Sequence, residues 1–170
     1  KVIDKSYLKD PEIIRLAIQE YASALKYAPA AFRNNIDVIK LAGSGALPFI
    51  SKRKAIELLS FNGHYMTDAP PSIQRCKACV MSAVGNHGLV LEHASFKLRM
   101  NAEVVRAAVQ NDGLALQYVE GTLNDDDDIV NLAVCNNGLA LEYASPRLKS
   151  DPVTVYTAVD NNSRALIFAA

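Results

Sequence analysis

Apolar residues recur along the chain in short blocks at helical spacing, and each block ends at a turn signal. Between Asp128 and Val134 they fall at i, i+1, i+4 and i+5, a helical stripe that differs from the alternation of a strand. The following Asn136-Asn137-Gly138 predicts the end of this helix, because Asn and Gly tolerate the left-handed conformation common there. A second block, from Leu139 to Ala144, has room for about two turns of helix. The pattern therefore predicts a pair of short helices.

This helix pair is a repeat with a step of 25 residues. Asp126, Asp128 and Asp151 precede or begin the first helices as candidate N-caps, and Asp10-Pro11 starts an earlier unit in the same way. Units of this size cannot bury their apolar faces alone and must stack on their neighbours. Three columns keep one residue type through four successive units: Val84, Val109, Val134 and Val159; Asn86, Asn111, Asn136 and Asn161; Leu91, Leu116, Leu141 and Leu166.

These units predict an all-α solenoid of short helix pairs, a single domain over residues 1–170 with about seven units. Residues 8–35 and 73–170 are expected to be regular. Residues 36–72 are expected to be degenerate, because Gly43, Gly45 and Pro48 shorten one unit and Pro70-Pro71 interrupts the next. A leucine-rich-repeat horseshoe is the alternative fold, since its period range includes this step. Its leucine-rich motif is missing, however, and the Ala-rich first element is not strand-like.

The two ends of the sequence lead us to expect a piece of a longer protein. Lys1 is not an initiator Met, and the last residues, Leu166 to Ala170, stop inside a patterned segment. Targeting is therefore unreadable. No apolar run approaches the roughly 20 residues that a membrane-spanning helix needs, so we expect no membrane span.

The composition is that of a globular chain whose charge is unevenly distributed. Half of the residues are hydrophobic and 21% are charged, which excludes disordered and membrane-embedded classes. The formal net charge is zero, yet residues 1–100 carry 14 Lys and Arg against 8 Asp and Glu, whereas residues 101–170 carry 4 against 10. Such a dipolar molecule offers one region to acidic partners and another to basic partners. Three cysteines are a poor disulfide framework and fit a reducing compartment such as the cytosol.

The repeat signature D-x-x-V-V-x-x-A-V-x-N-x-G-x-A-L-x-Y-A resembles the uncharacterised helical repeat family known as domain of unknown function 4116. Units starting near residues 78, 103, 128 and 153 carry it; the unit near Asp10 carries it loosely, with Tyr21 where the Asn-x-Gly turn should be. The middle departs from it, so the resemblance covers about two thirds of the chain. It implies a scaffold without catalytic activity, of the kind found in effectors of intracellular bacterial pathogens, which act in the host cytosol after secretion, and in large protist and algal proteins.

Cys76-x-x-Cys79 together with His87 and His93 has the residue types of a zinc site. The gap between Cys79 and His87 is shorter than the roughly twelve residues or more that separate ligand pairs in structural zinc sites. The repeat also favours packing, because two of the four share columns with apolar or aromatic residues: Cys79 with Val104 and Ile129, and His93 with Tyr118, Tyr143 and Phe168. We expect no metal, no cofactor and no catalytic residue in this chain.

Two charged runs are candidate partner-binding residues: Asp125, Asp126, Asp127 and Asp128, and Lys52, Arg53 and Lys54. The acidic run is interpreted either as an N-cap with first-turn carboxylates favoured by the helix dipole, or as a cation site or a dock for a basic partner. It lacks the spaced oxygens and the Gly of a calcium loop. The basic run is either a solvated helix start or a contact for an anionic partner. Neutral overall charge and the absence of interleaved aromatics leave no strong nucleic-acid signal.

The Asn column (Asn86, Asn111, Asn136 and Asn161) is the most regular polar feature. We predict a structural role for it: a buried Asn in each unit bonds the turn backbone of its own or the next unit and satisfies helix-end groups. Arg106, Asn131 and Tyr156 share another column, which is expected to face solvent. Variation at exposed columns on a fixed scaffold is how a solenoid makes a specific surface.

The sequence thus predicts a non-enzymatic scaffold for a protein or peptide partner. An enzyme with a pocket in the interrupted middle, residues 43–71, is one alternative, although the common phosphate-loop, nucleophile-elbow and metalloprotease motifs do not occur. Binding of anionic lipid or nucleic acid through the basic first half is the other alternative.

Overall fold

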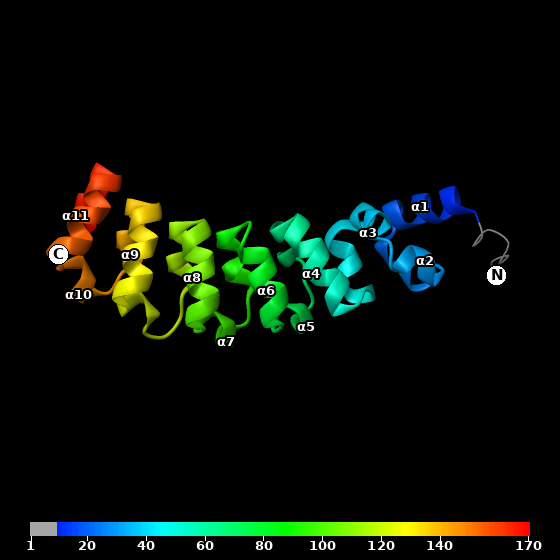
Figure 1. Cartoon of the computed structure of the whole chain (residues 1–170), viewed down its shortest axis with the longest axis horizontal. Coiled ribbons are helices and arrows are strands. Elements are labelled where there is room, and N and C mark those ends of the chain that lie inside the picture. The colour runs from blue at the N-terminus through cyan, green and yellow to red at the C-terminus, as the bar shows by residue number, and fades with distance from the viewer. Residues whose placement is uncertain (1–9) are drawn as a thin grey trace.

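The structure, a computed structural model, describes residues 10–170, and this range contains helices and no strand. The main α-helices stand side by side along one axis, so that the molecule is elongated (Figure 1). They are α1 (Pro11–Glu20), α3 (Ile36–Ala42), α4 (Lys52–Phe61), α6 (Lys77–Val84), α8 (Ala102–Asn111), α9 (Asp127–Asn136) and α11 (Pro152–Asn161). Each of the last four packs on the main helix before it, which confirms the predicted all-α repeat array.

The second element of each unit is a 3₁₀-helix and not the short α-helix expected from the sequence. These elements are η2 (Ala22–Lys26), η3 (Gly43–Phe49), η4 (Gly63–Met66), η5 (Gly88–His93), η6 (Gly113–Tyr118), η8 (Gly138–Tyr143) and η9 (Ser163–Phe168). Most units end in a further one-turn helix where a loop was expected: α2 (Ala30–Arg33), α5 (Pro71–Gln74), α7 (Phe96–Arg99) and α10 (Pro146–Lys149), with the 3₁₀ turn η7 (Leu123–Asp125) at this place in one unit.

Side-chain caps fix where the main helices begin. Asp10, Asp126 and Asp151 each accept a hydrogen bond from a backbone N–H of the first turn, at 2.9, 2.9 and 2.8 Å. These bonds satisfy amides that have no partner inside the helix. Asp128, the other candidate cap, lies inside α9.

The main helices end without the left-handed residue that the Asn-Gly turns suggested. In residues 10–170 only Gly43 and Gly121 have positive φ. Asn137, which follows α9, is extended with φ −147°, and its side chain instead caps the next element by accepting from the Leu139 N–H at 3.1 Å. The turn therefore starts a 3₁₀-helix.

Glycine follows at this turn because the next unit approaches closely. A Cβ at Gly113 would collide with the carbonyl oxygen of Ala133, one unit further along. Gly88 and Gly138 meet Ala108 and Ala158 in the same way. Successive units can stack at this distance only where the turn has no side chain.

The Asn column bridges neighbouring units through the same turn. Asn136 Oδ1 accepts from the Gly113 N–H at 2.8 Å, and its Nδ2 donates to the Gln110 carbonyl at 3.0 Å, so it binds the unit that precedes it. The equivalent pairs of bonds join Asn86 to Gly63 and Ser60, Asn111 to Gly88 and Gly85, and Asn161 to Gly138 and Cys135. The side chains are not buried as expected: Asn86 is half-buried and the other three are exposed. We call this arrangement the asparagine clamp.

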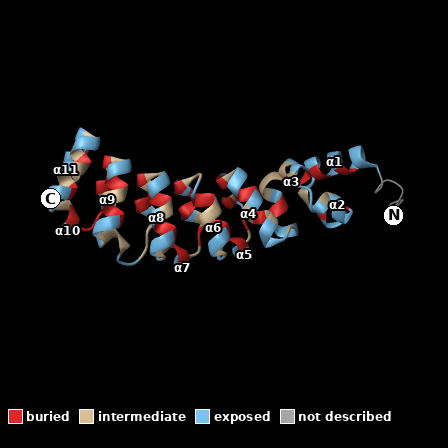
Figure 2. Cartoon of the chain, viewed as in Figure 1, coloured by how far each residue is buried: buried red, intermediate tan, exposed pale blue. Residues whose placement is uncertain are grey.

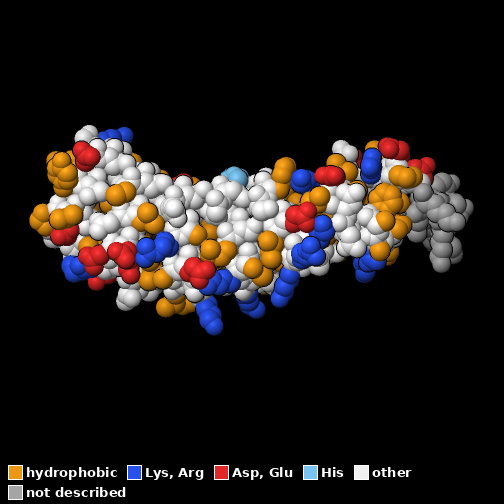
Figure 3. All heavy atoms as spheres, in the orientation of Figure 1, with side chains coloured by type: hydrophobic (Ala, Val, Ile, Leu, Met, Phe, Trp, Pro, Cys, Tyr) orange, Lys and Arg blue, Asp and Glu red, His pale blue; other side chains and the backbone are white. Residues whose placement is uncertain are grey.

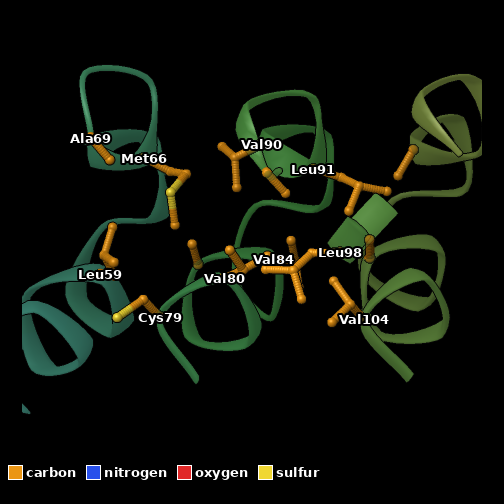
Figure 4. Close-up of a cluster of buried hydrophobic side chains, with 14 of the residues drawn as sticks. Leu59, Met66, Ala69, Cys79, Val80, Val84, Val90, Leu91, Leu98 and Val104 are labelled. Atoms are coloured by element: carbon orange, nitrogen blue, oxygen red, sulfur yellow. The ribbon is translucent and has the colours of Figure 1, made fainter. Parts of the chain in front are cut away.

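The core is one continuous layer between the main helices and the 3₁₀-helices (Figure 2). Figure 4 shows a section of it, where Val80 and Val84 of α6 lie among Leu59, Leu91 and residues of the neighbouring units. The Ala and Val positions that face the next helix are fully buried. Each unit thus buries its apolar stripe only by contact with its neighbours.

The middle of the chain is more regular than the sequence suggested. The unit that starts at Ser51 places α4, η4 and α5 at the same offsets as the next unit places α6, η5 and α7. Only residues 35–50 form a short unit, in which η3 follows α3 directly and no one-turn helix precedes α4. Gly43, with φ 55°, makes this direct junction. In the order of its elements, the part of the expected degenerate range 36–72 that follows Ser51 matches the next unit.

Replacement of Asn136 by Ala should destabilise the array. It removes two bonds between units and leaves the N–H of the buried Gly113 without its partner, so we expect a loss of about 1–3 kcal/mol in chemical denaturation. Asn131 is not the solvent-facing control that its column suggested, because it is half-buried and accepts from the buried Thr154 hydroxyl at 3.2 Å. Asn34→Ala, at an exposed Asn outside the column, is the matched control and should change stability by less than about 0.5 kcal/mol. Equal shifts would contradict the clamp.

Replacement of Gly113 by Ala should also destabilise, by about 1–3 kcal/mol or more, because the new methyl group forces the Ala133 backbone away. Ser163 stands in the same column and already has a side chain, so Ser163→Ala should stay within about 0.5 kcal/mol. Thermal unfolding of the two variants measures the difference. A tolerated Gly113→Ala would show that close approach does not set the spacing between units.

Candidate functional site

The four carboxylates of Asp125 to Asp128 are engaged within the chain itself. Asp126 caps α9. Arg147 lies in the one-turn helix α10 and reaches back to the residues at the start of α9. Its Nε donates to Asp125 Oδ1 at 2.9 Å, and its Nη2 donates to Asp127 Oδ2 at 2.9 Å. Asp128 lies 3.6 Å from the Arg106 guanidinium. The N-cap interpretation of this run therefore fits better than an acidic dock or a cation site.

These contacts shift the acidity of the run. A hydrogen bond from the Ser145 hydroxyl and then the bonds from Arg147 lower the pKa of Asp125. The bond from Arg147 lowers the pKa of Asp127 in the same direction. Both carboxylates therefore stay charged at a lower pH than an ordinary Asp does, and both are hydrogen-bonded to Arg147. The exposed ion pairs are consequently local links between two units and leave little free charge for a partner.

The basic run lies at the start of α4, where Lys52 and Arg53 are exposed. Lys54 is half-buried and pairs with Glu57 at 2.7 Å, one helical turn away. The three side chains therefore do not act as one patch. Lys52 and Arg53 remain open to solvent.

A larger cluster of basic side chains, which the sequence did not suggest, lies between α5 and α7, at the lower edge of the molecule in Figure 1. A hollow of about 740 Å³ is lined by Arg75, Lys77, Ser95, Phe96, Lys97, Leu98 and Asn101. Phe96 is 59% exposed, and Figure 3 shows Lys and Arg side chains projecting from this edge. Lys77 pairs with Glu103, whereas Arg75 and Lys97 make no ion pair within residues 10–170. The lining residues come from two stretches of the chain, 75–77 and 95–101, which the stacking of successive units brings together.

The zinc-like set does not converge on one point. Cys76 and Cys79 lie together, with their sulfur atoms 2.9 Å apart, and Cys79 is fully buried. His93, on η5, is half-buried. Tyr118 and Tyr143, which occupy the same column in the next two units, are half-buried as well. Within residues 10–170 there is no group of three or more His, Cys, Asp or Glu side chains placed to hold a metal ion.

His87 instead contacts His64 of the preceding unit. The two imidazole rings lie with their centroids 4.0 Å apart, because one unit stacks on the next at this turn. His87 Nδ1 is 2.5 Å from Asn86 Oδ1, the atom that also accepts from the Gly63 N–H. Burial, and then the neighbouring His64, lower the pKa of His87. The pair therefore adds a titratable group to one asparagine clamp.

Two hollows of the described residues lie outside the stretch 43–71, in which an enzyme pocket was the alternative expectation. One is the basic hollow, and the other, of about 400 Å³, lies between α1 and α3. The stretch itself places Leu47, Leu58, Leu59 and Met66 in the core. None of the helices in the described part of the chain combines the length and the apolar character needed to cross a membrane.

Acid should weaken the array through His87. Its folded pKa is lowered, so the unfolded chain takes up the proton first, and stability falls as the pH drops below about 6.5, the unfolded value. His87→Asn installs the residue found in this column at Asn137 and Asn162 and should remove part of the loss in melting temperature between about pH 7.5 and 5. His93→Tyr, matched to its own column, should retain the full loss. Identical pH profiles for both variants would contradict this role for His87.

The comparisons with known proteins agree with the repeat geometry. A family model described as Domain of unknown function (DUF4116) matches three overlapping stretches, residues 76–124, 101–149 and 126–170. Successive matches begin 25 residues apart, at the N-cap positions of α6, α8 and α9. No curated protein and no solved structure matches the chain. The three matches together cover more than half of the sequence, and the chain belongs to the DUF4116 family.

Proposed function

We propose that this chain is a non-enzymatic scaffold that binds a protein partner through its surface, as an interaction module of an effector-type protein. The main support for the proposal is that some columns of the repeat keep their residue type whereas others vary from unit to unit. The clamp asparagines, the turn glycines and the buried Ala and Val positions repeat from unit to unit. Exposed columns change their chemistry at every step, as in Gly85, Gln110, Cys135 and Asp160. A constant frame with a varied surface is the arrangement of repeat proteins that bind partners.

The basic hollow between α5 and α7 is the favoured contact. It combines two unpaired cations, Arg75 and Lys97, with an exposed aromatic ring at Phe96. Aromatic residues and Arg are enriched where interfaces gain most of their energy. The acidic run is a weaker candidate, since Arg147 and Arg106 already occupy its carboxylates. We therefore expect the partner to present an acidic segment with at least one apolar side chain.

The test is direct binding of labelled peptides, measured by fluorescence anisotropy. The probe is a peptide of alternating Glu and Phe, and the references are the same peptide with Lys for Glu and with Ser for Glu. The acidic peptide should bind best, with an association rate that falls as salt rises. Arg75→Ser with Lys97→Thr should weaken it by about tenfold, the effect of losing roughly 1.4 kcal/mol. Ser150 and Thr122 show that these columns accept the new residues.

The control loses the same two charges elsewhere: Lys149→Gln with Arg164→Gln, in the acidic half of the chain. It should bind the acidic peptide as the unchanged protein does. An equal loss in both double variants would show that net charge alone attracts the peptide and would contradict a site at the hollow. Preference for anionic vesicles or single-stranded RNA over the peptide would favour the alternative of an anionic lipid or nucleic-acid binder.

A further inference from the structure

Cys76 and Cys79 occupy two positions of the repeat whose side chains meet in α6 and also in α11. Cys76 is the N-cap of α6, and Cys79 is the third residue of that helix. In α11 the same two positions hold Asp151 and Thr154, where the Thr154 hydroxyl donates to Asp151 Oδ2 at 2.8 Å. In α6 the corresponding atoms are two sulfurs, 2.9 Å apart. The capping geometry of the repeat thus aims one thiol at the other.

The thiol pair replaces a helix cap. In the units of α8, α9 and α11 the N-cap side chain accepts from the backbone N–H of the third residue. Cys76 makes no such bond, and α6 has no side-chain cap. Sulfur is a weak acceptor, so two cysteines give up a contact that Asn or Asp would make well at these positions. Packing alone explains one of them, since Cys79 sits in the core on the side of Leu59 (Figure 4), but it does not explain Cys76.

The two thiols differ in their exposure to solvent. Cys76 is half-buried at the lower edge, between Arg75 and Lys77, which line the basic hollow. Cys79 is fully buried, and burial together with the neighbouring Cys76 raises its pKa to about 12, against the opposing charge of Lys52. A reagent from solvent therefore meets Cys76 first. Cationic, partly exposed surroundings are those in which cysteines react.

We propose that Cys76 and Cys79 are a redox-active dithiol that closes to an intramolecular disulfide by exchange with an anionic disulfide of the glutathione type. The Cys76 thiolate attacks one sulfur of the reagent, whose S–S bond breaks and releases one reduced glutathione. Cys79 then loses its proton to solvent and attacks the Cys76 sulfur, and the second glutathione leaves. Two electrons pass from the protein to the reagent. Arg75 and Lys97 attract its carboxylates, and the product ties the first turn of α6.

The test uses the whole chain with Cys135→Gln, which removes the third thiol and installs the residue that its column has at Gln110. Protein equilibrated with reduced and oxidised glutathione is quenched with acid, alkylated and mapped by mass spectrometry. Closure releases two glutathione molecules for each one consumed, so the disulfide fraction rises when the buffer is diluted at a constant ratio, whereas a mixed disulfide does not respond. We expect a Cys76–Cys79 disulfide with this dilution response.

Two further variants keep the result interpretable, with circular dichroism as the check of their fold. Cys79→Val, the residue of Val104 in its column, should stop at a mixed disulfide on Cys76 that dilution leaves unchanged. Cys76→Asn, matched to Asn101, should take up no glutathione. The proposal is overturned if a mixed disulfide persists at Cys76 while Cys79 is present. It is equally overturned if the pair stays reduced where exposed Cys135 of the unchanged chain reacts, or closes only in denaturant.

Discussion

The asparagine clamp fixes how each unit sits on the one before it. Apolar packing between α6, α8, α9 and α11 supplies the attraction, but burial of methyl groups has no preferred direction and would tolerate sliding. Hydrogen bonds are directional. Asn136 binds both the Gln110 carbonyl near the end of α8 and the first N–H of η6, so it ties two elements of one unit to a third element of the next. In a linear array with contacts only between neighbours, this register has to be set again at every step.

The remaining local features follow from the clamp. The Asn can reach the Gly113 N–H only if the turn backbone lies against the next helix, and that approach excludes a side chain at the turn. The Asp112 side chain then holds the turn by accepting from the Leu114 N–H at 3.0 Å, which starts η6 as a tight 3₁₀ coil. The three positions of Asn-x-Gly thus have different roles in one turn: the first binds the preceding unit, the second caps the 3₁₀-helix, and the third leaves room for the next helix. Exposed columns outside this turn, such as that of Gln110 and Cys135, have none of these roles and vary between units.

The sequence predicted what a single unit determines and missed what two units determine together. Helical spacing at Asp128 to Val134, the N-caps Asp10, Asp126 and Asp151, and the buried Val84, Val109 and Val134 follow from local pattern, and the structure has them. Spacing within the six residues of a block such as η8 cannot separate a 3₁₀-helix from an α-helix, since both bring every third or fourth residue to one side. The bonds of Arg147 to Asp125 and the stacking of His64 on His87 join residues more than 20 apart, and only the stacked structure brings them together.

Ser163 occupies the turn column in which the four preceding units have glycine. At Gly63, Gly88, Gly113 and Gly138 a further unit covers the turn, and a Cβ there would strike its backbone or its clamp asparagine. Ser163 brings a Cβ to this column in the unit of α11 and η9. At the four glycines the bare turn and the helix that covers it form one fit. A Cβ at any of them would push the next helix, and with it the clamp asparagine, away from the N–H that the asparagine binds. Close packing and the directional hydrogen bond therefore depend on the same position of the repeat.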